Sequence, residues 1–128
     1  MAPVTILLID SDADSIAIYT LILQHHGFSV IEANDAEDGF RQAVEKKPDV
    51  VVAALYGPPV GDTSLLDRLL TDERLAETRL IILDSAPTQL GEPAETIAAV
   101  RRLTKPCEPS RLLHEVQRVL DEPQPLPR

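Results

Sequence analysis

The chain has 128 residues, a length that suits one domain able to bury a hydrophobic core without disulfides or a structural metal. Its 12 Lys and Arg residues against 21 Asp and Glu residues give a formal net charge of −9, which disfavours direct binding to nucleic acid or to an anionic membrane surface. The single cysteine, Cys107, excludes an internal disulfide. Together with a short apolar amino-terminal run that lacks a basic segment, it predicts a cytoplasmic protein without a signal peptide or membrane span.

The first half of the chain alternates between short apolar runs and longer segments with helical periodicity. Side chains that can cap a helix precede each periodic segment, and Gly27 and Pro48 stop the two segments. In chain order these signals predict a strand at 4–9, a helix that begins at Asp12 or Asp14 and ends at His26, a strand at 28–32, and a helix over 36–47 capped by Asn34 or Asp35.

An apolar run after Pro48 is predicted to be the central strand. Residues 50–54 carry no polar side chain, so neither face favours water, as in a parallel strand buried on both sides. In a doubly wound sheet, ligands bind at the carboxyl ends of the central strands. The residues at that end are Ala54, Leu55 and Tyr56, and none is a carboxylate or an ordinary nucleophile.

The second half of the chain continues the alternation with weaker signals. In chain order it predicts a loop at 57–64, a helix at 64–75, a strand at 80–83, a short helix at 94–100, a strand at 101–104, and an amphipathic helix that Pro109 opens at its first position. The end of the chain contains three prolines and is predicted to be extended or disordered. The chain is therefore divided into a domain at 1–121 and a Pro-rich tail or truncated linker at 122–128.

Five strands alternating with five helices predict an α/β fold, a (βα)5 doubly wound parallel sheet with flavodoxin-like topology and strand order 2-1-3-4-5. In that order the first and third strands flank the topological switch point. The crevice at this edge of the sheet is predicted to collect residues from the ends of four strands, namely Asp10, Ser11, Asp12, Ala54, Asp84, Ser85 and Lys105.

With these motifs in this order, residues 4–120 resemble the receiver domain of two-component response regulators. The resemblance is carried by ILLIDSD at the end of the first strand, DAEDGFRQAVEKKPDVVV leading into the third, and LTKPCEPSRLLHEVQRVL from the fifth strand onward. It implies two acidic residues after the first strand that hold Mg²⁺ and a phosphoacceptor aspartate that ends the third strand. It also implies a Thr or Ser at the end of the fourth strand and a Lys-Pro pair after the fifth.

At the site itself the resemblance is partial. The matching residues are Asp10 for the first acid, Pro58 for the proline beyond the acceptor, and Lys105 with Pro106 for the Lys-Pro pair. The departures are Ser11 for the second acid, Ala54 for the phosphoacceptor and Arg102 for an aromatic switch residue, while the hydroxyl position falls on Asp84 or Ser85. A methyl group has no oxygen to attack phosphorus, so the resemblance implies a pseudo-receiver without a phosphoacceptor.

The favoured hypothesis is a phosphorylation-independent receiver-like module that acts by protein–protein interaction in a two-component-type pathway and is not an enzyme. Its implied partners are a histidine kinase, an output domain or a second copy of the chain. No cofactor is expected, and Arg101 and Arg102 are candidates for the partner surface. Asp10 and Asp12 are weak candidates for a metal site, because exposed acids at a helix start are commonly structural. Lys105 is expected to form a salt bridge with Asp10 or Asp84.

Two other functions remain open from the sequence. The first is a phosphorelay receiver that is phosphorylated on a non-standard acid, such as Asp62 or Asp84. The second is a flavodoxin-like cofactor binder, which needs a loop of Ser, Thr and Gly after the first strand to hold phosphate. The acidic, glycine-free sequence DSDADS at that place disfavours it.

Overall fold

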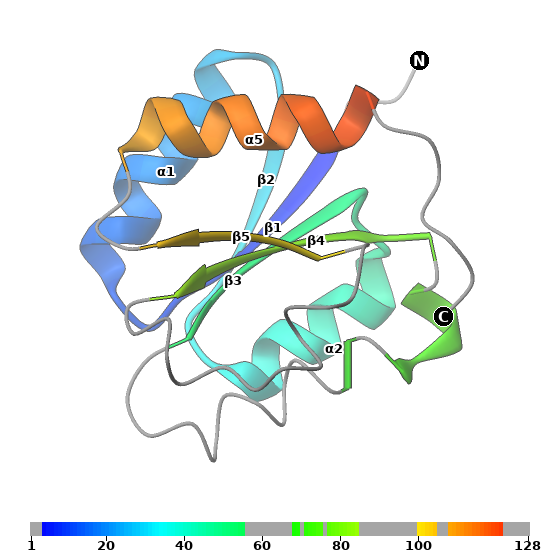
Figure 1. The fold of residues 1–128 in the computed structure, drawn as a ribbon. Helices are drawn as coiled ribbons and strands as arrows, with labels where there is room; N and C mark the ends of the chain where they lie inside the picture. The colour runs from blue at the N-terminus through cyan, green and yellow to red at the C-terminus, as the bar shows by residue number, and fades with distance from the viewer. Residues whose placement is uncertain are drawn as a thin grey trace.

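The computed structural model describes residues 4–55, 68, 69, 71–75, 77–84, 100–104 and 108–121. These residues form one parallel sheet with the order β2-β1-β3-β4-β5, as predicted. The strands are β1 (Thr5–Ile9), β2 (Ser29–Ala33), β3 (Val50–Leu55), β4 (Arg79–Asp84) and β5 (Val100–Thr104). The helical elements are α1 (Ala13–His25), α2 (Ala36–Lys46), α5 (Pro109–Asp121) and the 3₁₀ turn η1 (Glu73–Leu75). Figure 1 shows the doubly wound α/β arrangement.

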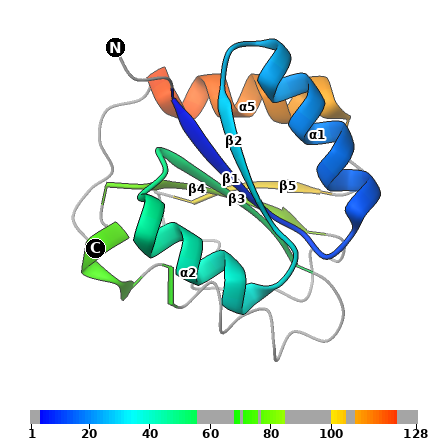
Figure 2. The ribbon, with the colours of Figure 1, turned by 180° about the vertical axis from the view of Figure 1, so that it is seen from behind.

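Helices cover both faces of the sheet. Helices α1 and α5 lie on one face and α2 lies on the other, as Figures 1 and 2 show from opposite sides. Alternate residues of each central strand supply the two cores, because successive side chains of a strand point to opposite faces. Val52 packs on the α1/α5 face and Val51 packs on the α2 face, and both are fully buried. The all-apolar run in the sequence therefore marks the central strand, as predicted.

Capping hydrogen bonds explain where α1 and α2 begin, and backbone conformations mark where they end. Of the two candidate caps for each helix, Asp12 caps α1 and Asp35 caps α2, and each side chain accepts a hydrogen bond from a backbone N–H of the first turn. Gly27 follows α1 with a φ of 91°, a conformation that favours glycine. Lys47 adopts the left-handed conformation at the end of α2, directly before Pro48.

The structure corrects several predicted boundaries. Strand β2 is shifted by one residue to end at Ala33, and β4 is longer than predicted at both ends. Val100 was predicted to end a helix, but it belongs to β5, where it pairs in register with Leu80. The predicted helix at 64–75 does not continue to Leu75, because the chain leaves helical geometry at Asp72 and η1 follows. The remaining predictions for 56–67, 85–99, 105–107 and 122–128 lie outside the described residues.

An ion pair accounts for the interruption at Asp72. Its carboxylate accepts hydrogen bonds from the backbone N–H of Arg74 at 2.9 Å and from the Arg74 guanidinium at 2.7 and 3.0 Å. These hydrogen bonds lower the pKa of Asp72 to about 2. Asp72 therefore starts η1 in the way that an N-cap residue starts a helix.

No helix in the described part of the chain is long and apolar enough to cross a membrane.

Candidate functional site

The carboxyl ends of the central strands form the candidate site, and their register fixes which residues are neighbours. Ile9 pairs with Ala53 of β3, so the next residues along the two strands, Asp10 and Ala54, are adjacent. Ala54 in turn pairs with Leu83 of β4, and Leu83 pairs with Leu103 of β5. The position that the resemblance assigns to a phosphoacceptor is therefore flanked by one acid and one leucine.

Asp10 is a buried carboxylate, with only 4% of its surface exposed. Its backbone N–H donates to the carbonyl oxygen of Ala33 at 3.0 Å, and its Oδ1 accepts a hydrogen bond from the backbone N–H of Asp12 at 2.8 Å. Buried charges need such partners, because an unpaired carboxylate loses the solvation it has in water. The side chain of Asp10 thus holds the loop between β1 and α1 in place.

The other two residues of this loop are exposed, and they differ in their contacts. Asp12 uses both carboxylate oxygens for the start of α1, since Oδ1 accepts from the backbone N–H of Asp14 at 3.1 Å and Oδ2 accepts from the Ser15 hydroxyl at 2.9 Å. Ser11 lies at a bend between the two acids. The loop is acidic, and its carboxylates accept hydrogen bonds from the loop backbone and from the first turn of α1.

Ala54 belongs to the hydrophobic core of the α1/α5 face, together with Val52 and Leu83. It is 8% exposed, so its methyl group lies at the border between this core and the crevice. Next to Asp10 is a space too small for a water molecule, lined by Leu8, Ile9, Asp10, Ile16, Tyr19, Val52 and Leu83. Among the described residues, mainly apolar side chains therefore pack around Asp10 on this side.

The described residues do not fit a Mg²⁺ ion at this edge. Mg²⁺ in phosphoryl-transfer sites takes octahedral oxygen ligands from one or two carboxylates and from phosphate oxygens. Here the Asp10 carboxylate accepts a hydrogen bond from the loop and the Asp12 carboxylate accepts from the first turn of α1, and neither Ser11 nor Ala54 supplies a carboxylate. Within the described ranges no group of three His, Cys, Asp or Glu side chains is placed to hold a metal ion.

The remaining predicted site residues are placed only in part. Asp84 is the last residue of β4 and pairs with Leu55 and Thr104, one register row beyond Ala54. Arg101 and Arg102 lie in β5, the edge strand of the sheet. Ser85, Lys105, Pro58, Pro106 and Cys107, and with them the predicted salt bridge of Lys105, lie outside the described residues.

Sequence reasoning missed two apolar contributions to the site. Leu83 is the register partner of Ala54, and it was not among the predicted site residues. Tyr19 lies beneath Asp10 and is 5% exposed. Its position three residues after Ile16 and four before Leu23 marks it as part of the buried face of α1.

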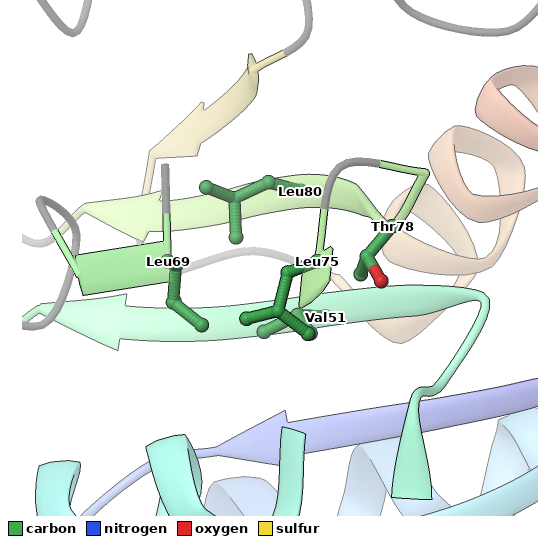
Figure 3. A pocket seen from close by; sticks show the side chains of 5 residues that line it. All are labelled: Val51, Leu69, Leu75, Thr78 and Leu80. Carbon is green, nitrogen blue, oxygen red and sulfur yellow. The ribbon is translucent and has the colours of Figure 1, made fainter. Parts of the chain in front are cut away.

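A second small cavity lies at the opposite end of the sheet, on the α2 face. Figure 3 shows the side chains that line it, Val51, Leu69, Leu75, Thr78 and Leu80. Among the described residues that line it, Thr78 alone has a polar side chain, and its hydroxyl donates to the carbonyl oxygen of Pro48 at 3.1 Å. With about 10 Å³ open to the centre of a water molecule, this cavity is a packing defect rather than a ligand site.

The fold and the position of the crevice define a receiver-type α/β domain. The chemotaxis response regulator CheY4 of Vibrio cholerae is similar in structure, with a TM-score of 0.79 and 21% identity over 92% of this chain and 99% of that one. A CheY-like receiver domain from Methylobacillus flagellatus has a TM-score of 0.78 at 16% identity, covering 92% and 99%. No family model matches the chain.

Sequence relatives agree with this fold. The DNA-binding dual master transcriptional regulator RpaA of Synechocystis sp. is 30% identical over 128 residues, which cover 96% of this chain and 52% of the relative. Protein PilH of Pseudomonas aeruginosa is 27% identical over 116 residues, covering 90% of this chain and 96% of the relative. The chain thus spans about half the length of RpaA. Together these similarities show a receiver-like fold and a sequence similarity to response regulators.

Proposed function

We propose that the protein is a pseudo-receiver, a cytoplasmic, phosphorylation-independent regulatory module that acts by binding other proteins and carries out no catalysis. The observation that carries the proposal is Ala54 at the end of β3, in the register position beside Asp10. Formation of an acyl phosphate requires a carboxylate oxygen as the nucleophile. The packing of Ala54 within the core of the α1/α5 face supports a site that serves structure instead of phosphoryl transfer.

Two observations weigh against the alternatives. Asp84 is a candidate for a substitute phosphoacceptor. It pairs with Leu55 and Thr104 and not with Ala54, so phosphorylation there would need a differently arranged site. The loop after β1 presents carboxylates to the start of α1, where Asp12 already occupies the backbone N–H of Asp14. A cofactor phosphate at this helix terminus would meet negative charge in place of free N–H donors.

The wild-type protein is expected to remain unmodified by small-molecule phosphodonors. After incubation with acetyl phosphate and Mg²⁺, intact-mass measurement should find no phosphoryl adduct, because position 54 offers no carboxylate. Beryllofluoride with Mg²⁺ should likewise leave the amide NMR spectrum unchanged. An adduct that maps to Asp84 or any other acid would refute phosphorylation independence and revive the phosphorelay alternative.

The proposed partner surface is the edge of the sheet at β5, the strand that contains Arg101 and Arg102, two basic residues in a chain with a net charge of −9. Such a surface favours an acidic partner through electrostatic complementarity. Replacing both arginines by glutamate should lower the affinity for a kinase or output-domain partner by roughly tenfold or more, mainly through slower association. Retention of full affinity in a binding titration would remove the arginines from the interface.

A further inference from the structure

Helix α1 is apolar on both of its sides. Ile16, Tyr19 and Leu23 face the core and are buried, whereas Ile18 and Leu21 lie on the outer side with 52% and 71% of their surfaces exposed. Helices α2 and α5 carry their apolar residues mainly on one side, and α1 nearly lacks this asymmetry. A helix that is apolar all round is usually covered on both sides.

The outer residues of α1 form a straight seam, here called the α1 seam: Asp14, Ile18, Leu21 and His25. Their spacings of four, three and four residues are those of a coiled-coil stripe. At 3.6 residues per turn the four positions fall within a sector of about 60°. All four are exposed, and the sector lies opposite the buried residues of the helix. Figure 2 shows α1 at the flank of the molecule, beside β2 and α5.

The α1 seam is complementary to itself when two copies run antiparallel. A two-fold axis midway between Ile18 and Leu21 sets each Ile18 against the partner's Leu21. The same axis sets Asp14, in the first turn, against the partner's His25, in the last turn. An acidic and a basic residue then meet at both ends of an apolar centre, and exposed Ala17 beside the seam allows close helix approach.

From this self-complementarity we propose that the protein forms a symmetric homodimer through the α1 seam, with the two α1 helices packed antiparallel. A partner surface of a single charge sign would complement only one end of the seam, because the seam carries one acidic and one basic end. A second copy matches both ends at once. This inference is independent of the pseudo-receiver proposal and uses a surface separate from β5.

The size of the seam sets the strength of the dimer. The 13 residues of α1 extend over about 20 Å at 1.5 Å per residue, so the contact is smaller than a standard interface and its association is reversible. The net charge of each copy opposes association. This repulsion is screened at about 0.15 M salt, where the Debye length is about 8 Å.

Sedimentation velocity of the full chain across a range of concentrations at this salt tests the proposal. The wild type should show a concentration-dependent monomer–dimer equilibrium. Leu21→Glu and Ile18→Glu should each weaken association at least tenfold, because each removes two buried apolar side chains per dimer. Gln117→Glu adds the same charge on the exposed side of α5 and should leave association unchanged. Because all three positions are exposed, thermal melts should confirm that every variant folds.

A charge exchange tests the antiparallel register. His25→Glu places two acids together at each end of the seam and should weaken the dimer, and adding Asp14→Lys to the same chain should restore it. A protein that stays monomeric at all concentrations, or a dimer unaffected by Leu21→Glu, would overturn the α1 dimer. Failure of the double charge variant to recover would overturn the antiparallel pairing. None of these outcomes alters the phosphodonor result, so the two proposals fail separately.

Discussion

Ala54→Asp is expected to lower the free energy of unfolding by about 2–3 kcal/mol at neutral pH, the cost of a poorly compensated carboxylate at a nearly buried position. Ala54 is 8% exposed and packs with Val52 and Leu83, so the new side chain enters an apolar cluster. Its neighbour in register is Asp10, which is 4% exposed, and two adjacent carboxylates repel each other. Chemical denaturation at pH 7 measures the change.

Mg²⁺ should reverse this loss only when a second new carboxylate is present. In the variant that combines Ala54→Asp with Ser11→Asp, three acids surround the crevice, as the receiver resemblance requires. A ligand that binds only the folded state at a hundred times its dissociation constant stabilises the fold by about 2.7 kcal/mol. The double variant should therefore recover most of its stability in Mg²⁺ and should gain a phosphoryl adduct from acetyl phosphate.

Two control variants separate charge from size. Ala54→Asn has nearly the same volume as the aspartate variant but no charge, so it should lose less stability and show no response to Mg²⁺. Ser11→Asp alone changes an exposed residue and should be close to neutral. If the double variant binds Mg²⁺ but takes up no phosphoryl group, the site differs from a working receiver in other residues besides its carboxylates. Equal losses for Asp and Asn at position 54 would contradict the electrostatic account.

The pattern of the sequence was sufficient to predict the architecture. The apolar run at 50–54 has no polar face, as a central parallel strand buried on both sides requires. The strand order followed from five strands joined by crossovers, and the caps at Asp12 and Asp35 were among the predicted candidates. These features depend on local chemistry and on rules of chain connection, both of which can be evaluated from one sequence.

The detail of the site was harder to predict because it depends on the register between strands. Asp84 was predicted at the end of the fourth strand, where β4 ends, but Leu83 was not identified as the register partner of Ala54. The direction of the Asp10 carboxylate, toward the backbone of its own loop, also has no sequence signal of its own. Val100 was predicted at the end of a helix. It instead joins β5 because it pairs with Leu80, and such a contact between distant segments leaves no local signal in the sequence.

Gly39→Ala is expected to destabilise the protein by about 1–2 kcal/mol, although alanine is the better helix former by about 1 kcal/mol. Gly39 is buried in α2, where the helix approaches β1. A Cβ atom at this position would lie 2.6 Å from Cδ1 and 2.8 Å from both Cγ atoms of Ile9. Ile9 is 3% exposed, and its branched side chain is stiff about χ1, so it cannot easily move aside.

A double-mutant cycle with Ile9→Ala identifies this contact as the cause. Ile9→Ala removes all three atoms in the clash and alone should lower the free energy of unfolding by about 2–5 kcal/mol. The loss in the double variant should be smaller than the sum of the two single losses by about 1–2 kcal/mol. Gly27→Ala provides the matched comparison, because its φ of 91° creates strain while no atom lies within 4 Å of the new Cβ. Its loss should add to that of Ile9→Ala without coupling. Additive losses for Gly39→Ala and Ile9→Ala would show that α2 can shift away from β1, and Ile9 would then not fix the approach of the two elements next to Asp10.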